Sequence, residues 1–407
     1  MILQYLNKRT ENQILLETNK LNLDSIFGGG KNKLIKGDNL KVLKTLLEDF
    51  KLKGGIDLIY IDPPFATNNH FTIGDERVST ISNSKNDKIA YKDELVGSEF
   101  LEFLRERLIL LRELLSDQGS IYLHIDYKIG HYVKIIMDEV FGIENFKNDI
   151  TRIKCNPKNF KRKAYGNIKD LILFYSKTKN PIWNDPKEEL TKEDFERLFK
   201  KVDSKGRRYT TIPLHAPGET KNGPTGKEWK GQLPPKGRHW RTDPKILEEW
   251  DKQGLIEWSK NGNPRKIIFA DEKDGKKKQD IWNYKDLQYP TYPTEKNLDL
   301  LKDIVLASSN KDSIVLDCFC GSGTTLQASQ ELGRNWIGID QSEEAIKVVQ
   351  ERLENIPTSL FNIDSNYEYF EEQKIKIKRT PLKTTKKLIP NFETEKELVL
   401  KDNLVNY

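Results

Sequence analysis

The stretch SIVLDCFCGSGTT, residues 313–325, decides the fold of this 407-residue chain. Its apolar run ends at Asp317, a loop with Gly321 and Gly323 follows, and the next ten residues have a helical pattern. Glycines in such a loop let the backbone approach a ligand, and the helix that follows presents unpaired N–H groups to an anion. The next apolar run, NWIGID, ends at Asp340, whose carboxylate can accept hydrogen bonds from both hydroxyls of a ribose. The pattern predicts a site for an adenosine-containing cofactor, the alternative being a tight structural turn.

The alternation of strands and helices runs through both ends of the chain. Four more apolar runs predict strands: KLIKGD ending at Asp38, DLIYID at 57–62, SIYLHID at 120–126 and DLILFYSK from Asp170. Helical patterns cover 39–50, 98–116 and 294–308. This spacing is typical of a mostly parallel sheet with crossover helices, so we expect an α/β core built from both ends of the chain.

The middle of the chain has a different composition. Residues 178–285 are rich in Pro, Gly and basic residues, which predicts a loop-rich insertion. Residues 151–285 contain 33 Lys and Arg against 19 Asp and Glu, whereas the whole chain has a net charge of only +6. Such a surplus suits a surface that faces nucleic acid, although a solvated face would look the same.

We therefore expect five segments. They are an N-terminal extension at 1–32, one half of the core at 33–177, the insertion at 178–285, the cofactor-binding half at 286–356, and a C-terminal tail or arm at 357–407.

Composition excludes several classes of protein. No run of apolar residues is long enough to span a membrane, and the N-terminal residues lack the apolar run of a signal peptide. Three cysteines cannot form a disulfide framework, and the Cys318–Cys320 pair lacks the other ligands of a zinc site. We expect a cytoplasmic protein without a metal site.

A second motif, Asp62-Pro63-Pro64-Phe65, follows the strand at 57–62. The two prolines stiffen the loop and leave its carbonyl groups free to accept hydrogen bonds. The lone pair of an amino group on adenine or cytosine is delocalised into the ring, so the nitrogen is a poor nucleophile. Asp62 and the Pro63 carbonyl could accept its hydrogens and localise that lone pair, while Phe65 stacks on a flipped base. Without the glycine loop, DPPF would more often be a structural turn.

In this order, the motifs KGDN, LIYIDPPF, GSIYLHID, YPTEK, VLDCFCGSGTT and WIGID resemble those of the β group of amino-group DNA methyltransferases. The sequence around these motifs is most similar to that of the methylation (Mod) subunits of Type III restriction-modification systems. The resemblance implies a Rossmann-like class I methyltransferase core that uses S-adenosyl-methionine. Such a core has a mixed, mostly parallel sheet, a permuted motif order and an inserted target recognition domain.

The resemblance also implies roles for single residues. Asp62, Pro63, Pro64 and Phe65 would be catalytic. Phe319, Gly321 and Gly323 would lie under the methionine part of the cofactor, Asp340 would bind the ribose, and Asp38 the adenine amino group. Thr294 and Lys296 would lie at the methionine end, and the expected cofactor site also includes Asp317 and Thr324. The chain has Glu295 and Asn297 where the family commonly has Gln and Pro.

Asp rather than Ser at position 62 favours adenine over the 4-amino group of cytosine in family members of this kind. Alternatives are cytosine, RNA or a protein amide as substrate, and a silent DNA-binding regulator. Expected partners are duplex DNA, a restriction subunit and a second copy of the chain. The candidate DNA-binding residues are Arg207, Arg208, Lys227, Lys236, Arg238 and Arg241, with Trp229, Trp240 and His239 as candidates for base stacking. His124 follows a strand and is expected to be packed or to line the site.

Overall fold

The fold is described from a computed structural model. It describes residues 2–64, 97–157, 161, 163–290, 292–293, 295–356 and 367–373, and the backbone of three short strands, β4 (His70–Ile73), β5 (Val78–Ser79) and β6 (Lys88–Lys92). Within these residues no helix is both long and apolar enough to cross a membrane.

A ten-stranded sheet forms the centre of the described core. In spatial order its strands are β1 (Leu23–Gly28), β21 (Tyr367–Glu372), β2 (Asn32–Lys36), β20 (Asn335–Asp340), β19 (Ile314–Asp317), β3 (Ile56–Ile61), β7 (Leu115–Ile125), β9 (Lys169–Ser176), β8 (Phe146–Ile153) and β18 (Ile281–Trp282). The five neighbours β2, β20, β19, β3 and β7 are parallel, so their carboxyl ends meet at one edge. All six strands predicted from the sequence are confirmed, as is the mixed, mostly parallel α/β sheet.

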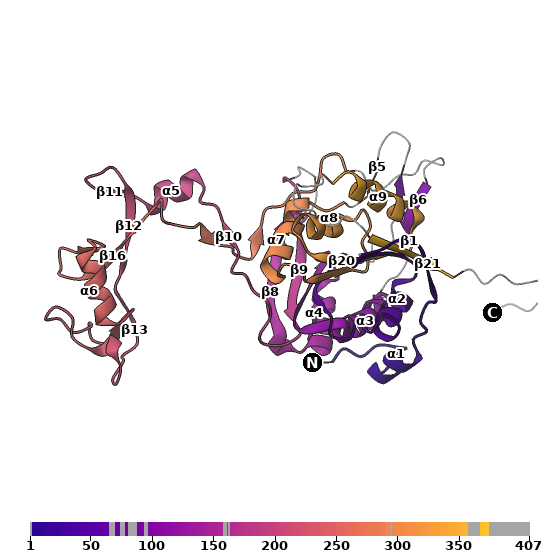
Figure 1. Ribbon diagram of the computed structural model, residues 1–407, viewed down its shortest axis with the longest axis horizontal. Coiled ribbons are helices and arrows are strands. Elements are labelled where there is room, and N and C mark those ends of the chain that lie inside the picture. Colours follow the sequence, from indigo (N-terminus) through magenta and orange to yellow (C-terminus); the bar gives the residue numbers. More distant parts are fainter. Residues whose placement is uncertain are drawn as a thin grey trace, which may run out of the picture. The chain divides into compact units, whose positions relative to one another are not determined.

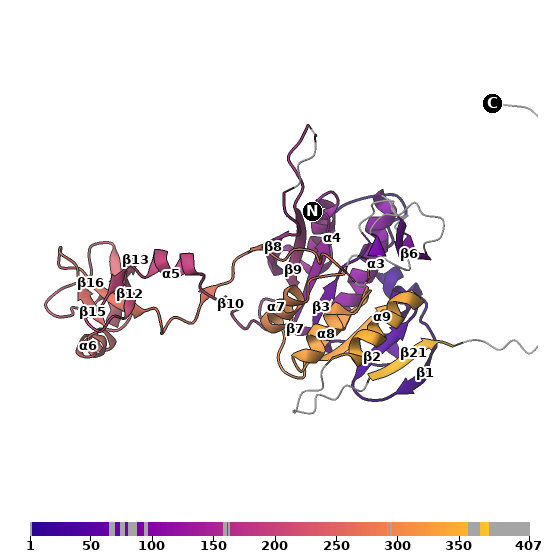
Figure 2. The same ribbon diagram turned by 90° about the horizontal axis from the view of Figure 1, so that it is seen from above.

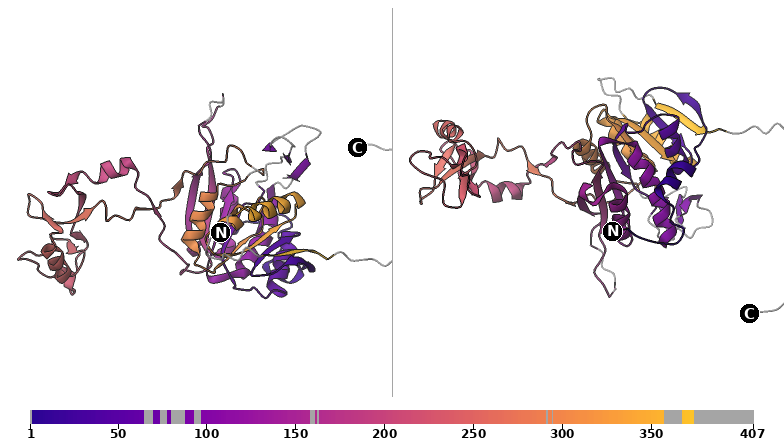
Figure 3. Two further views of the ribbon diagram at one scale, coloured as in Figure 1. Left: turned by 45° about the horizontal axis from the view of Figure 1, so that its top comes forward. Right: turned by 90° about the horizontal axis from the view of Figure 1, so that it is seen from below.

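Two layers of helices cover the sheet (Figures 1 and 2). One layer contains α1 (Glu11–Glu17), α2 (Asn39–Glu48), α3 (Gly97–Leu114) and α4 (Gly130–Phe141), and the other α7 (Leu298–Ser308), α8 (Thr324–Glu331) and α9 (Glu343–Glu354). Successive strand residues point to opposite faces, so in β3 Ile59 and Ile61 join the core under α2 and α3, whereas Leu58 and Tyr60 join the core under α7. Further views show the same layering (Figure 3).

The predicted helix at 294–308 begins later than expected. Asn297 accepts a hydrogen bond from the Asp299 N–H at 2.9 Å and so caps α7, which starts at Leu298. The described residues of the YPTEK segment, Tyr292, Pro293, Glu295 and Lys296, therefore all precede the helix.

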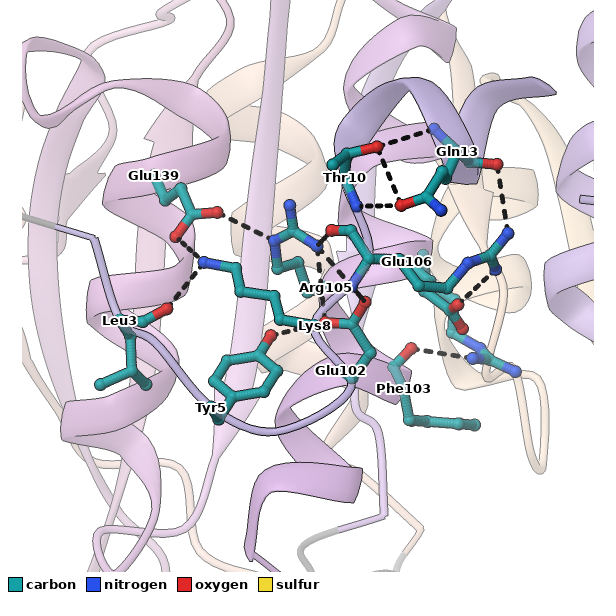
Figure 4. A network of polar contacts seen from close by, with 12 residues as sticks. Leu3, Tyr5, Lys8, Thr10, Gln13, Glu102, Phe103, Arg105, Glu106 and Glu139 are labelled. Carbon is teal, nitrogen blue, oxygen red and sulfur yellow. Dashed lines mark hydrogen bonds and ion pairs between the residues drawn. The ribbon is translucent and has the colours of Figure 1, made fainter. Parts of the chain in front are cut away.

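The N-terminal residues are tied to α3 and α4 by a polar network (Figure 4). The Tyr5 hydroxyl donates to Glu102 at 2.6 Å, Lys8 pairs with Glu139 at 2.7 Å, and Arg105 donates to the Arg9 carbonyl at 2.8 Å. Arg105 and its partners lie at least partly buried, so these bonds are less screened by solvent than ordinary surface pairs.

Three strands of the central sheet, β1, β21 and β18, lie outside the predicted core limits of 33–177 and 286–356. β21 pairs in parallel with β2 and antiparallel with β1, so residues from the expected extension and tail extend the sheet. The pairing buries Tyr369 and Phe370 of β21. Burial of these rings is the physical reason for a strand in a stretch whose sequence looked irregular.

Residues 178–285 contain small elements of their own. They are β10 (Lys187–Glu188), α5 (Lys192–Leu198), β11 (Lys201–Val202), β12 (Arg208–Pro213), β13 (His215–Pro217), β14 (Arg238–Trp240), α6 (Pro244–Lys252), β15 (Ile256–Trp258), β16 (Pro264–Phe269) and β17 (Lys276–Lys277). Leu214, Trp229, Trp240 and Leu247 form a separate hydrophobic cluster here. The last strand of this stretch, β18, joins the central sheet beside β8.

Candidate active site

A cavity of about 570 Å³ opens where the parallel strands end. Its wall includes residues that follow β2, β20, β19 and β3, together with the segment before α7. Small-molecule sites commonly have volumes of roughly 300–1,000 Å³. In doubly wound sheets, ligands bind outside these carboxyl ends, which agrees with the place of this cavity.

The glycine loop forms one side of the cavity. Gly321 has a φ of +49° and Gly323 a φ of +77°, values that L side chains rarely adopt. Asp340 accepts hydrogen bonds from the N–H of Gly321 and of Ser342, both at 2.9 Å, and so links the loop to the end of β20. A carboxylate has about four lone-pair sites, so Asp340 can accept further bonds from a ligand.

Asp317 holds the start of the same loop. Its carboxyl oxygens accept hydrogen bonds from the Phe319 N–H at 3.0 Å and from the Thr325 hydroxyl at 2.6 Å. Burial raises the pKa of Asp317 to about 7 and also raises the pKa of Asp340. α8 begins at Thr324, and no side chain among the described residues caps it, so its first N–H groups can bind an anion.

The end of β2 forms another part of the wall. Asp38 caps α2 by accepting a hydrogen bond from the Lys41 N–H at 3.2 Å. Asn39 donates to the Cys318 carbonyl at 2.7 Å and accepts from Arg107 at 2.6 Å. Burial lowers the pKa of Arg107 to about 10, yet the side chain lines the cavity.

Asp62 lies at the end of β3 with its two carboxyl oxygens in different environments. Oδ2 forms an ion pair with Lys296, which is carried by the YPTEK segment. Oδ1 is buried and has no hydrogen-bond partner among the described residues. A buried acceptor without a partner is costly, so Oδ1 is suited to a donor supplied by a ligand.

The charge of the cavity suits a positively charged ligand. Among the described residues of its wall, seven have carboxyl groups, Asp38, Asp62, Glu295, Asp317, Asp340, Glu343 and Glu344, and two are cationic, Arg107 and Lys296. S-adenosyl-methionine combines a sulfonium, an ammonium and a carboxylate. The acidic wall fits its cations, the uncapped start of α8 fits its carboxylate, and Asp340 fits a ribose.

The structure brings most of the sequence-predicted site residues together. Asp38, Asp62, Pro63, Pro64, Lys296, Asp317, Phe319, Gly321, Thr324 and Asp340 all line the cavity. Gly323 is the N-cap residue of α8, where a Cβ would lie 2.9 Å from Val349, so the lack of a side chain allows close packing. Phe65 and Thr294 lie outside the described residues.

The candidate DNA-binding residues lie in the inserted stretch, and most have partners within it. Arg207 pairs with Asp271 and Glu272, and the side chains of Arg208, Arg238 and Arg241 donate to Phe199, His215 and Pro213. Lys227 accepts a hydrogen bond from Trp240 through its carbonyl, and Lys236 lies in the turn before β14. His239 bonds the Gly218 carbonyl at 2.8 Å.

The idea that Trp229 and Trp240 stack on bases is wrong for this structure. They are 4% and 1% exposed and form the hydrophobic cluster of the inserted stretch. Burial of such large side chains contributes more stability to this small core than an exposed position would, which is the physical reason for the difference.

Sequence reasoning missed Arg107, Asn39 and Tyr292 as residues of the cavity wall. One feature of the sequence could have indicated Arg107. It is a charged residue among the apolar residues of the helix FLRERLILL, and charged side chains are rarely buried unless they have a partner. His124 is fully buried beside Tyr60, which confirms that it is packed.

Comparison with known proteins identifies the family. A family model described as DNA methylase matches residues 56–351. The Type II methyltransferase M.EcaI of Enterobacter cloacae is 42% identical over 328 residues, which cover 79% of this chain and 69% of that protein. The Type III restriction-modification enzyme EcoPI Mod subunit of Escherichia phage P1 is 28% identical, and the match covers 77% of this chain but only 58% of the Mod subunit.

Among solved structures, the M1.HpyAVI-SAM complex aligns with a TM-score of 0.40 and 19% identity, over 79% of this chain and 99% of that chain. The expected cofactor agrees with the family, whose enzymes use S-adenosyl-methionine. On the family match and the 42% identity to M.EcaI, the chain belongs to the N6/N4 DNA methylases and is a DNA methyltransferase.

Proposed function

We propose that the protein methylates the N6-amino group of adenine in duplex DNA, at a specific sequence, as the modification enzyme of a restriction-modification system. The observation that carries this proposal is the environment of Asp62. Its Oδ1 atom is buried and has no hydrogen-bond partner among the residues that the structure describes, and it lies at the wall of a cavity that suits S-adenosyl-methionine. An exocyclic amino group is a donor that would satisfy it.

The chemistry follows from what the two sides of the cavity offer. When bound, S-adenosyl-methionine supplies an electrophilic methyl group on its sulfonium. Asp62 Oδ1 and the Pro63 carbonyl accept the two amino hydrogens, which localises the nitrogen lone pair and stabilises the positive charge that develops on the nitrogen. Pro63 and Pro64 hold the carbonyl in place because their φ angles are fixed, and Phe65 stacks on the flipped base.

We assign the cofactor contacts in the same way. Asp340 binds the ribose hydroxyls, Asp38 the adenine amino group, and the start of α8 at Thr324 the carboxylate. Phe319 and Gly321 lie under the methionine part. Lys296 is assigned to the methionine end together with Thr294.

Adenine is favoured over cytosine for two reasons. The motif has Asp at position 62, whereas family members that act on the 4-amino group of cytosine tend to have Ser there. The relatives also include Type III Mod subunits, as well as M.EcaI, and the Type III Mod relatives favour adenine. Since the family model covers both N6 and N4 methylation, the base is decided by experiment.

The inserted stretch at 178–285 is proposed as the target recognition region. It contains a basic surplus and its own hydrophobic cluster, so it can hold a DNA-facing surface in shape. The exposed cations Lys227 and Lys236 are its first candidates for phosphate contacts. We also propose that the chain works with a restriction subunit, associates with a second copy of itself and is located in the cytoplasm.

The test is single-molecule sequencing with detection of modified bases. Genomic DNA is taken from a methylation-free host that expresses the wild-type protein, Asp62→Ala or Asp57→Ala. Asp57→Ala is the matched control, because it removes a carboxylate from the opposite end of the same strand, where Asp57 accepts a bond from Ser116 at 2.9 Å.

We expect methyladenine at one short motif with the wild type and Asp57→Ala, and none with Asp62→Ala. Calorimetric titration should show that Asp62→Ala still binds S-adenosyl-methionine, because the loop, Asp340 and α8 are unchanged. Methylcytosine in place of methyladenine would refute the assignment of the base. Normal methylation by Asp62→Ala would refute the mechanism.

A further inference from the structure

Four polar side chains cross the sheet in a line, one from each of four neighbouring strands. They are Tyr60 in β3, His124 in β7, Asp170 in β9 and Arg152 in β8, and we call them the polar row. All lie on the face that α7 covers, since their neighbours Leu58, Tyr122, Ile172 and Ile150 belong to that core. None of the four has a part in the methyl transfer described above.

The polar row is continuously bonded. The Tyr60 hydroxyl and His124 Nδ1 are 2.9 Å apart, His124 Nε2 and Asp170 Oδ2 are 3.3 Å apart, and Arg152 donates to the same Oδ2 at 3.3 Å. Arg152 and Asp170 are direct partners in the β8–β9 ladder. Lys154 adds an ion pair to the other oxygen of Asp170 at 2.6 Å.

The four side chains of the polar row are buried, so each of them needs a hydrogen-bond partner within the protein. Tyr60, His124, Asp170 and Arg152 are between 0% and 3% exposed. Polar groups buried this deeply are costly unless each finds a partner, so the bonds along the row depend on one another. The loss of one partner leaves its neighbour with a buried, unmatched group.

The charges fix the direction of the bonds. Arg152 and Lys154 keep Asp170 an acceptor, so His124 donates from Nε2 and its Nδ1 accepts the Tyr60 proton. Burial lowers the pKa of His124, which favours this neutral form of the ring. The Tyr60 hydroxyl therefore donates its proton to His124 Nδ1.

One end of the row is in the active-site wall. Tyr60 lines the cavity, as does Asp62, which stands two residues later and directly follows β3. A shift of Tyr60 would therefore disturb the wall in which Asp62 is held.

The other end is tied to the segment that leaves the inserted stretch. Arg152 donates to the Tyr284 carbonyl at 2.7 Å and pairs with Asp286 at 2.5 Å, and the Asp286 N–H donates to the Lys154 carbonyl at 2.7 Å. The same segment continues to Lys296, the ion-pair partner of Asp62. Residues 284–286 thus mark the end of the inserted stretch, precede the Lys296 segment in sequence and contact the row directly.

We propose that the polar row is a positioning device that couples the seating of residues 284–286, where the inserted stretch ends, to the placement of Tyr60 beside Asp62. The proposal rests on the proposed function, since it makes methyl transfer depend on how the recognition region is held. Tyr60, His124, Asp170 and Arg152 act as positioning residues. A physical warrant for such coupling is an energetic interaction between the two ends, which can be measured.

The test compares Asp286→Ala, Tyr60→Phe and the double variant with a matched control, Asp274→Ala. The Asp286 side chain is 53% exposed, so its removal takes the ion pair from Arg152, the outer member of the row, without leaving a cavity in the core. Asp274→Ala removes an exposed ion pair of the same stretch, with Lys187 at 2.6 Å, that does not touch the row. The assays are kcat and KM for DNA methylation, together with DNA and cofactor dissociation constants.

We expect kcat to fall about tenfold in Asp286→Ala and in Tyr60→Phe, since a small misplacement of reacting groups has large effects on rate. KM and both dissociation constants should stay within twofold. The double variant should lose no more than the larger single loss, because both changes break the same row. A kcat within twofold of wild type in Asp286→Ala, or losses that multiply in the double variant, would overturn the proposal.

A second readout does not depend on activity. In protein labelled with ¹⁵N-histidine there are five histidines, and the His124 signals are identified by their loss in His124→Asn. Asp286→Ala and Tyr60→Phe should shift the ring-nitrogen signals of His124, and Asp274→Ala should not. If the wild type methylates no DNA, the proposed function fails, but this spectrum still decides the row: unchanged His124 signals in Asp286→Ala would refute it.

Discussion

Gly323 offers a sharp test of how the cofactor loop is built. Its φ is +77°, and a Cβ added there would lie 2.9 Å from Val349 Cγ2 on α9. Gly333 has a similar φ of +72°, but a Cβ there would meet no atom of the described residues within 4 Å. The pair therefore separates the cost of backbone conformation from the cost of a clash.

The magnitudes follow from these two geometries. A left-handed conformation costs a residue with a Cβ about 1–2 kcal/mol, so Gly333→Ala should lower the free energy of unfolding by about 1 kcal/mol. Gly323→Ala adds overpacking against buried Val349, which costs about 1–3 kcal/mol more. In a Val349→Ala background the clash is relieved, so Gly323→Ala should then cost only about 1 kcal/mol, like Gly333→Ala.

The assay is equilibrium urea denaturation of the wild type, Gly333→Ala, Gly323→Ala, Val349→Ala and the double variant at position 323 and 349. A double-mutant cycle gives the coupling between Gly323 and Val349, expected to be about 2 kcal/mol. Titration of S-adenosyl-methionine should show weaker binding for Gly323→Ala than for Gly333→Ala. Equal costs of Gly323→Ala in both Val349 backgrounds would refute the account of close packing.

Three further outcomes are expected. Burial raises the pKa of Asp317 from 3.8 to about 7, so the native state keeps a proton that the unfolded chain releases above about pH 4. The melting temperature of the wild type should therefore fall as the pH rises from 4 to 7. The melting temperature of Asp317→Asn should not show that fall. Trp240→Ala should cost about 3–5 kcal/mol within the inserted stretch and abolish specific DNA binding, while calorimetry still detects cofactor binding, because Trp240 belongs to a separate cluster. If Lys236 contacts a phosphate, Lys236→Gln should reduce the slope of log K against log salt by about one, measured by fluorescence anisotropy; an unchanged slope would remove Lys236 from the interface.

The sequence located the core of the site because its signals are local. An apolar run followed by Asp, Gly or Pro marks the end of a strand, and Asp38, Asp62, Asp317 and Asp340 each stand at such an end. Parallel strands then bring these ends to one edge of the sheet, so residues 300 positions apart needed no further signal to meet. Local pattern and topology together account for the four aspartates of the cavity wall, Asp38, Asp62, Asp317 and Asp340.

Other features depend on pairing between distant parts of the chain. Strand β21 reads as a charged stretch, YEYFEE, and becomes a strand because it lies between β1 and β2. The polar row requires the register of four strands, so His124 by itself could only be predicted as packed or lining the site. Trp240 was misjudged because an aromatic residue among basic ones fits a small hydrophobic core as well as it fits a DNA surface.

The chain has Glu295 where the family commonly has Gln, and the structure shows how this carboxylate is paired. Glu295 forms an ion pair with Arg352 of α9, and Arg352 also donates to Gln327 of α8 at 2.9 Å. Arg352 therefore balances the charge that Glu295 adds and ties it to the two helices that follow the glycine loop. Lys296, the next residue, keeps its ion pair with Asp62. Since the neighbouring residues Glu295 and Lys296 contact α9 and Asp62, the segment before α7 connects two parts of the cavity wall, and a Glu at position 295 is compatible with that connection.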